Sequence, residues 1–287
     1  MRTRAAILHE LGLPQAYAQK VVVRIASAGL CHSDLSNLNG TLPKETPLAL
    51  GHEAAGVVEE VGLGVTYVKP GDHVIFAFVA MCGECAMCAA GKPALCIPGH
   101  AANRAGGILR GGTRFRLHGK PVYHHLGVTA FTERTVCAQE SLVKIPADVP
   151  LEFAAMFSCG ALTGLGAVFN VAHAQPGMTI AIFGAGGVGL MALLGAVCAG
   201  ATAIVVDPLA NKRALAAELG AALTIDPNAG EPAAQINEAL GILGVDVAIE
   251  ATAHAPVVLQ ALAATVPAAW LLPSGSRTRR PPCRSLR

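Results

Sequence analysis

Four cysteines of this 287-residue chain, Cys82, Cys85, Cys88 and Cys96, are crowded into one short segment, although the chain has only nine cysteines in all. Zinc binds four thiolates tetrahedrally, and a Cys-x-x-Cys spacing lets one loop wrap around the ion. This cysteine lobe therefore predicts a structural zinc with no open coordination position. Disulfides, which need an oxidising compartment, and chance clustering of thiols are alternatives. An iron–sulfur cluster fits less well, because seven residues precede Cys96 and Ile97, not proline, follows it.

Three further candidate ligands, Cys31, His52 and Cys159, are scattered along the chain. Two thiolates and one imidazole can hold zinc and leave a fourth position open for water or substrate. Asp34 and Glu53 are candidate carboxylates behind the ligands, since a carboxylate that accepts the second ring N–H of a histidine fixes its tautomer. A lone histidine and two distant cysteines are more often core residues, so their spacing alone leaves both alternatives open.

A glycine-rich segment predicts a dinucleotide site. A strand over Thr179–Phe183 leads into Gly184, Gly186, Gly187, Val188 and Gly189, which we call the glycine turn. A helix from Leu190 to about Gly200 and a strand over Ala203–Val206 follow. The glycines permit a tight turn and close approach of a pyrophosphate, which the helix N-terminus attracts. Asp207, at the end of the second strand, can bind both ribose hydroxyls and favours NAD over NADP. A glycine turn without a ligand is the alternative.

The pattern of predicted secondary structure changes near the middle of the chain. Short strands separated by glycines, the first over Arg4–His9, predict a β-rich, barrel-like domain over 1–150, with an exposed loop at Gly99–Gly119. Helices and strands then alternate over 151–266, as in a doubly wound parallel sheet. The Arg-, Pro- and Ser-rich segment 267–287 has neither period and is predicted to be disordered.

The bulk composition narrows the class of protein. A chain that is 53% hydrophobic and 14% charged can fold, and a net charge of +2 argues against a nucleic-acid partner. Glycines interrupt the apolar run Thr179–Ala203, so we expect a buried strand and helix there and no membrane partner. Clustered thiols without an export signal indicate the cytoplasm.

Together these residues resemble the zinc-dependent alcohol dehydrogenases of the medium-chain dehydrogenase/reductase superfamily. The resemblance runs from about Arg4 to about Ala264. It rests on the cysteine lobe, the glycine turn, Gly29–Asp34, Gly51–Glu53 and Cys159–Gly164. It implies a GroES-like catalytic domain followed by a Rossmann domain, and two zinc ions per chain with NAD as cofactor. The catalytic zinc polarises the alcohol oxygen, and hydride passes to the nicotinamide.

The resemblance also assigns roles to single residues. The catalytic zinc site comprises Cys31, His52, Glu53 and Cys159, with Asp34 behind it. Ser33 takes the alcohol proton, while Ser36 stands where many relatives have a relay histidine. Phe78, His125 and Leu126 fall where relatives line the substrate pocket. The residues implied to bind the cofactor are His32, Thr163, Gly184, Gly186, Gly187, Val188, Gly189, Asp207 and Lys212.

The substrate implied is a small alcohol. Thr113–Phe115 and Pro121–His125 look most like the class III, glutathione-dependent branch, yet His100 stands where that class has arginine. A primary or aromatic alcohol, oxidised reversibly to an aldehyde, is therefore expected.

The chain also departs from the family. It is shorter between Glu10 and Val21, and from Pro267 onward it loses the family pattern, which continues with two more strands. We therefore expect a sheet that ends with the Asp246–Glu250 strand and leaves an open edge, and a truncated or frameshifted reading frame. An inactive zinc- and nucleotide-binding remnant is the alternative function. Relatives form homodimers or homotetramers.

Overall fold

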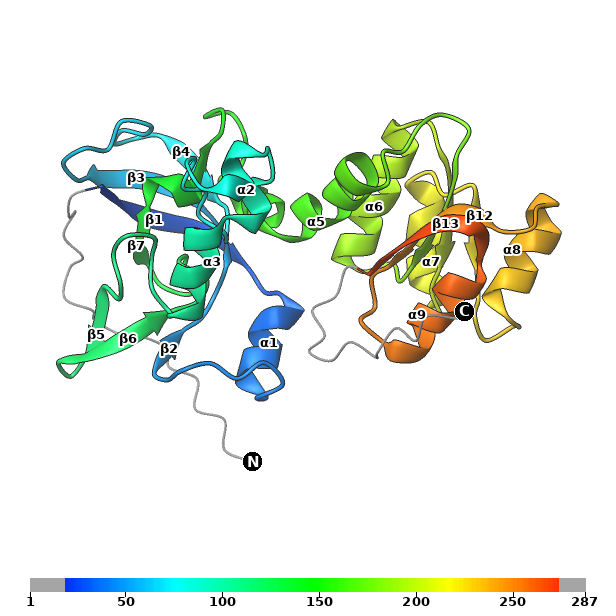
Figure 1. The fold of residues 1–287 in the computed structure, drawn as a ribbon, viewed down its shortest axis with the longest axis horizontal. Helices are drawn as coiled ribbons and strands as arrows, with labels where there is room; N and C mark the ends of the chain where they lie inside the picture. Colours follow the sequence, from blue (N-terminus) through cyan, green and yellow to red (C-terminus); the bar gives the residue numbers. More distant parts are fainter. Residues whose placement is uncertain (1–18, 274–287) are drawn as a thin grey trace. The chain divides into compact units, whose positions relative to one another are not determined.

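The computed structural model describes residues 19–273, and the chain divides into two units, Met1–Cys159 and Gly160–Arg287 (Figure 1). The division falls after Cys159 rather than after residue 150. Leu151 and the two alanines Ala154 and Ala155 pack in one apolar cluster with Ala55 of the first unit, which holds this segment there. The expected strand at Arg4–His9 lies outside the described residues.

The first unit is rich in short strands, as the sequence predicts. One sheet has the strand order β7-β1-β3-β4-β8, and a smaller sheet has the order β2-β6-β5. The strands are β1 (Lys20–Gly29), β2 (Leu48–Ala49), β3 (Glu53–Val61), β4 (His73–Phe76), β5 (Phe115–Leu117), β6 (Lys120–His124), β7 (Arg134–Ala138) and β8 (Leu142–Lys144). The helical segments are α1 (His32–Leu38), α2 (Ala86–Ala89), η1 (Pro93–Leu95), α3 (Ile97–Arg104), η2 (Gln139–Ser141), α4 (Leu151–Ala154) and η3 (Ala155–Ser158).

The core of the first unit follows from the alternation of side chains along β1. Successive strand residues point to opposite faces. Val21 and Val23 enter the main apolar cluster, whereas Val22 packs on the other side with Ile108 and Val136. Both faces of β1 are therefore buried, which fixes its register, since a slip by one residue would exchange the two sets.

The second unit contains one five-stranded parallel sheet with the order β11-β10-β9-β12-β13. Its strands are β9 (Thr179–Phe183), β10 (Thr202–Val206), β11 (Leu223–Ile225), β12 (Val245–Glu250) and β13 (Thr265–Pro273). Its helices are α5 (Gly160–Gly166), η4 (Ala167–Val171), α6 (Gly187–Cys198), α7 (Ala210–Glu218), α8 (Pro232–Leu240) and α9 (Ala255–Ala263). The predicted Rossmann-type sheet is confirmed.

Helices cover both faces of this sheet (Figure 1). Ile180 and Ile182 of β9 pack against α6, while Ala181 and Phe183 enter the cluster on the opposite face with residues of α8 and α9. A parallel strand buried on both faces reads as a continuous apolar run, as β9 does.

The expectation that the sheet ends at Asp246–Glu250 is wrong. β13 pairs in parallel with β12 after the crossover through α9. Predicted disorder over 267–287 is therefore wrong for residues up to Pro273, and 274–287 lie outside the described residues. The pairing is irregular between Val245 and Val247, where β13 advances from Thr265 to Trp270.

The predicted loop at Gly99–Gly119 is also only partly correct, because α3 and β5 occupy much of it. Pro98 lies in the first turn of α3, where its missing N–H costs nothing. The Cys96 thiol accepts a hydrogen bond from the Gly99 N–H and so caps the helix.

Within residues 19–273, no single helix is long and apolar enough to cross a membrane. One bent pair of helices, Leu151–Ser158 with Gly160–Val171, meets that test by length and composition only.

His124, at the end of β6, is buried as a neutral ring. Its Nε2 accepts the Arg114 backbone N–H at 3.2 Å, so its proton lies on Nδ1, 3.1 Å from the Thr129 hydroxyl. Burial, with a smaller effect from the Arg114 charge, lowers the pKa of His124 to about 3.

Acid is therefore expected to destabilise the chain through His124. Its folded pKa lies below the ordinary value of 6.5, so the unfolded state binds more protons between these values. The contribution of neutral His124 to the free energy of unfolding is therefore fully present above pH 6.5 and declines as the pH falls toward 3. His124→Gln keeps an acceptor near the Nε2 position but cannot titrate. We expect the free energy of unfolding, measured with urea, to fall between about pH 7 and about pH 5 in both proteins. The fall should be about 2 kcal/mol smaller in the variant than in the unaltered chain. Other acid-sensitive groups are common to both proteins, so equal losses would contradict this assignment.

Candidate active site

The structure brings four scattered donors of the first unit together. The ligand atoms of Cys31, His52, Glu53 and Cys159 all lie within 4.8 Å of one another. Cys31 caps α1, His52 directly precedes β3, Glu53 opens that strand, and Cys159 follows η3. His52 is buried, and the other three are half-buried.

Two glycines make room for this cluster. Gly51 has a φ of +93°, and a Cβ there would lie 2.7 Å from the Phe131 nitrogen, so only glycine fits before His52. A Cβ on Gly29 would overlap the Glu53 carboxylate. The placement of His52 therefore requires glycine at position 51, and the placement of the Glu53 carboxylate requires glycine at position 29.

The donor set fits a divalent cation such as zinc. A hydrogen bond with Cys159, assisted by contacts with His52 and Ser33, lowers the pKa of the Cys31 thiol to about 3. The same contact raises the pKa of Cys159, and burial together with the Cys31 charge raises the pKa of Glu53. Negative charge is therefore crowded here, and a bound cation would relieve the repulsion. Thiolate and imidazole are the donors that zinc prefers.

Asp34 lies behind these donors and is fully buried. Its Oδ1 accepts the Gly51 N–H at 3.1 Å, and its Oδ2 accepts the Cys31 N–H at 3.0 Å. The Nδ1 atoms of His52 and His125 lie 3.5 Å and 3.1 Å from Oδ1. Burial opposes ionisation, yet these contacts outweigh it and hold the pKa of Asp34 well below its usual range.

Asp34 also sets the orientation of His52. Because Nδ1 of His52 faces Asp34, Nε2 is the nitrogen left for a metal. Burial lowers the pKa of His52, but Asp34 and Cys31 outweigh it and raise that pKa to about 9 in the metal-free chain. A metal must therefore displace a proton from this ring.

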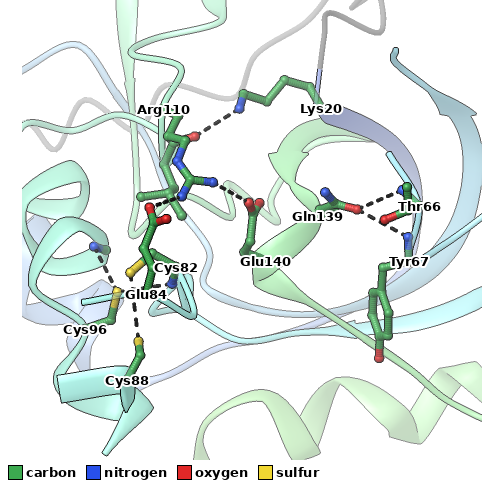
Figure 2. A network of polar contacts seen from close by, with 12 residues as sticks. Lys20, Thr66, Tyr67, Cys82, Glu84, Cys88, Cys96, Arg110, Gln139 and Glu140 are labelled. Carbon is green, nitrogen blue, oxygen red and sulfur yellow. Dashed lines mark hydrogen bonds and ion pairs between the residues drawn. The ribbon is translucent and has the colours of Figure 1, made fainter. Parts of the chain in front are cut away.

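The cysteine lobe forms a second cluster, with the four sulfur atoms within 4.8 Å of one another. The N–H groups of Cys82 and Gly99 point at the Cys96 sulfur at 3.3 Å and 3.4 Å, and the Cys85 N–H points at the Cys82 sulfur at 3.3 Å. Figure 2 shows Cys82, Cys88 and Cys96 of this cluster. Such N–H groups stabilise thiolate charge. All four donors are sulfur, so the lobe fits a closed, structural zinc.

Arg110 joins this lobe to the sheet of the first unit (Figure 2). Its guanidinium contacts Glu84 of the lobe at 2.6 Å and Glu140 of η2 at 2.9 Å. The preceding carbonyl, of Leu109, accepts a hydrogen bond from the buried ammonium of Lys20 at 3.0 Å. The loop that carries Arg110 is thus fastened on both sides.

The glycine turn of the second unit has the geometry that a dinucleotide needs. Gly184 has a φ of +99°, and a Cβ there would lie 2.7 Å from the Thr252 methyl group. A Cβ on Gly189 would overlap the Gly184 carbonyl, so this glycine permits close packing of α6 on β9. At Gly186 and Gly187 a Cβ would meet nothing within 4 Å, which leaves the N-terminus of α6 open to a phosphate.

Asp207 ends β10 beside this turn and is buried. Its Oδ2 accepts the Ala185 N–H at 2.8 Å, and its Oδ1 accepts the Leu209 N–H at 2.9 Å. Lys212 Nζ lies 3.9 Å from Oδ2. Each carboxylate oxygen can accept a further hydrogen bond, so Asp207 can both hold the turn and bind a ribose.

Two family models match the chain. Residues 17–147 match the alcohol dehydrogenase GroES-like domain, and residues 187–280 match the zinc-binding dehydrogenase domain. An S-(hydroxymethyl)glutathione dehydrogenase of Photobacterium damsela subsp. piscicida is 40% identical over 274 residues, which cover 91% of this chain and 74% of the relative. The chain belongs to the zinc-dependent alcohol dehydrogenases of the medium-chain dehydrogenase/reductase superfamily.

Further similar proteins and structures support the same family assignment. The S-(hydroxymethyl)glutathione dehydrogenase of Escherichia coli O1:K1 / APEC is 41% identical over 239 residues, which cover 79% of this chain and 65% of that protein. The crystal structure of benzyl alcohol dehydrogenase from Acinetobacter calcoaceticus superposes with a TM-score of 0.86 at 31% identity, over 93% of this chain and 72% of that one. The crystal structure of an alcohol dehydrogenase zinc-binding domain protein from Burkholderia ambifaria superposes with a TM-score of 0.84 at 36% identity, over 92% of this chain and 73% of that one. The chain thus spans just under two thirds of the length of its Escherichia coli relative.

The remaining residues that the sequence predicts for the site lie as follows. The Ser33 hydroxyl is 3.7 Å from the Cys31 sulfur, and the Phe78 ring makes an edge contact with His52 at 5.9 Å. His32 is exposed at the start of α1. Thr163 is half-buried on α5, next to Gly164, which packs closely on α6.

Sequence reasoning missed the contact of His125 with Asp34. It placed His125 only by its alignment with pocket residues of relatives. The available signal was the pair His124–His125, because neighbouring residues at a strand end face different surroundings.

Removing one thiol from the lobe should release one zinc. Cys96→Ser is expected to lower the zinc content from about two ions per chain to about one, and the unfolding free energy by at least about 2 kcal/mol. Cys198→Ser, at an exposed cysteine outside both clusters, is the matched control and should change neither. Metal analysis and thermal unfolding measure both effects, and an unchanged zinc content in the Cys96 variant would refute the lobe assignment.

Filling the space at Gly186 should block the dinucleotide without harming the fold. Gly186 has a φ of −87°, which any residue adopts, and open space around its Cβ position. Gly186→Val is expected to weaken NADH binding by at least about tenfold, with thermal unfolding of the nucleotide-free protein unchanged. Gly189→Ala, which introduces an overlap with a carbonyl, should instead lower the unfolding temperature. Unaltered NADH affinity in the Gly186 variant would count against the assigned phosphate site.

Proposed function

We propose that the chain catalyses the reversible, NAD-dependent oxidation of a primary or aromatic alcohol to an aldehyde. The observation that carries the proposal is the convergence of Cys31, His52 and Cys159 in front of the buried carboxylate of Asp34. The glycine turn, with its open helix N-terminus, supports dinucleotide binding by the same chain.

In this proposal Cys31, His52 and Cys159 would hold the catalytic zinc and leave a fourth position for the alcohol, with Glu53 as a further donor beside that position. When bound, zinc supplies Lewis-acid polarisation of the alcohol oxygen, and NAD supplies the hydride acceptor. Asp34 keeps Nε2 of His52 directed at the metal position. Ser33 relays the alcohol proton: its hydroxyl takes that proton and gives up its own to water, and it is placed for this beside Cys31, with its carbonyl fixed by a 2.7 Å hydrogen bond from Asn37.

The choice of alcohol rests on His100 and on the relatives. Relatives at about 40% identity are S-(hydroxymethyl)glutathione dehydrogenases, and a structural relative is a benzyl alcohol dehydrogenase. His100 stands where the glutathione-dependent class has arginine, and its Nε2 is bonded to the Ala94 carbonyl at 2.9 Å. A ring whose Nε2 is engaged in this way is a poor partner for a glutathione carboxylate. We therefore favour a primary or aromatic alcohol.

We also propose that the protein works in the cytoplasm. The eight cysteines of the described residues are all free thiols, and seven of them lie in metal-donor clusters or the interior of the first unit. An oxidising compartment would convert such clustered thiols into disulfides.

The decisive experiment is an assay of the purified, zinc-analysed chain. NADH formation is expected with benzyl alcohol and at a lower kcat/KM with S-(hydroxymethyl)glutathione. Ser33→Ala should lower kcat by about 100-fold, because it removes the proton acceptor. The matched control is Ser36→Ala on the same helix, which should retain activity. Zinc at the Cys31 site without turnover of either alcohol would refute the proposed activity, and a preference for the glutathione adduct would refute the proposed substrate.

A further inference from the structure

The carboxylate of Asp34 faces two histidines, although only one of them is a proposed metal ligand. His125 follows β6 and is 2% exposed. Its ring stands at 85° to that of His52, with ring centres 5.1 Å apart. Its Nδ1 lies closer to Asp34 Oδ1 than does Nδ1 of His52, at 3.1 Å against 3.5 Å.

Asn37 settles which nitrogen of His125 carries the proton. The Asn37 side-chain nitrogen donates to the Ser33 carbonyl at 2.7 Å and lies 3.2 Å from His125 Nε2. The reversed amide would place two carbonyl oxygens at 2.7 Å, so the nitrogen must face Ser33. Its second hydrogen then points at Nε2, which accepts. A neutral ring whose Nε2 accepts has its proton on Nδ1, the atom that faces Asp34.

These contacts exclude two other roles for His125. A pocket-lining histidine needs a ring atom available to substrate, yet this ring is buried, its Nε2 faces the Asn37 amide, and its Nδ1 faces Asp34. The donor atoms of Asp34, His52 and His125 lie within 4.8 Å of one another and could in principle hold a metal. A metal on Nδ1 of His125 would require the ring proton to move to Nε2, where it would oppose the Asn37 amide.

The position of Asp34 Oδ1 shows how the two rings depend on each other. Nδ1 of both rings lies near this oxygen, at 3.5 Å for His52 and 3.1 Å for His125, yet neither Nδ1 forms a hydrogen bond of regular geometry. Without His125, the Gly51 N–H would be the remaining donor to Oδ1, and the carboxylate could shift toward His52 and change the direction and basicity of its ring. An acceptor behind a ligand histidine controls both properties.

We propose that His125 is a positioning residue for the catalytic metal: it holds Asp34 Oδ1 between two imidazoles and thereby sets the orientation of His52. The role rests on the proposed function, because it concerns the same zinc site. Asn37 belongs to the same arrangement, since it fixes the proton of His125 on the side of Asp34.

Two matched amide variants test this role. The nitrogen of an asparagine side chain can occupy the place of Nδ1, so His125→Asn keeps a donor to Asp34. The oxygen of a glutamine side chain can occupy the place of Nε2, so His125→Gln keeps the contact with Asn37 and loses the donor. We expect His125→Gln to release Co²⁺ or Zn²⁺ from the Cys31 site to a chelator about 10- to 100-fold more readily and to shift the visible absorption of bound Co²⁺. His125→Asn should stay within about threefold of the unaltered protein.

The cysteine lobe is the internal control, because its metal should be retained equally in both variants. Equal metal loss in the Asn and Gln variants, or no change in either, would overturn the role of His125. If the unaltered protein showed no Co²⁺ band beyond that of the lobe, the proposed function would fail and this inference with it. A band that His125→Gln leaves unchanged refutes the inference alone.

A measurement on the unaltered protein covers the case in which a variant fails to fold. Long-range proton–nitrogen NMR spectra of the zinc-loaded, histidine-labelled protein should show His125 with its proton on Nδ1. A ring protonated on Nε2 would overturn the proposal.

Discussion

The buried charge of Asp34 is the constraint on which the candidate active site depends. Removing a carboxylate from water costs several kcal/mol unless donors replace the lost hydration. Here the donors are the N–H groups of Cys31 and Gly51, and the rings of His52 and His125 lie against the same carboxylate. They come from the start of α1, the segment before β3 and the end of β6. The fold can satisfy Asp34 only when these segments meet, and their meeting places a thiol and an imidazole side by side.

The two metal clusters and the glycine turn differ in whether their residues come from one local segment or from segments that are distant in the sequence. The cysteine lobe closes around four sulfurs from one loop, so its geometry is local. The Cys31 cluster is assembled from segments that are distant in the sequence. It also requires glycine at two positions, because the Glu53 carboxylate fills the space beside Gly29 and the Phe131 backbone fills the space beside Gly51. The glycine turn is intermediate, because its glycines are local but Gly184 must also pass Thr252 at the end of β12. Sites built from distant segments demand a correct tertiary fold before any ligand can bind.

This difference explains what could be predicted from the sequence. The lobe, the glycine turn and the parallel sheet follow from spacing and apolar runs. Cys31, His52 and Cys159 carry no local signal, and only their family resemblance united them. β13 was missed because proline and the Arg-rich residues beyond it outweighed the short apolar run Ala268–Leu272 in composition. The role of His125 could not be predicted, since it depends on which way Asn37 and Asp34 face in three dimensions.

Arg110 gives the cysteine lobe a property that its sulfurs alone would lack. The guanidinium contacts both Glu84 of the lobe and Glu140 of η2, and Lys20 holds the preceding carbonyl. A surface ion pair contributes little to stability by itself. As a tether, however, it attaches the segment between Cys82 and Cys85 to η2 through Glu84, without using any of the four thiols. All four sulfurs therefore stay available for a metal, while a charged pair outside the cluster restrains the loop that carries them.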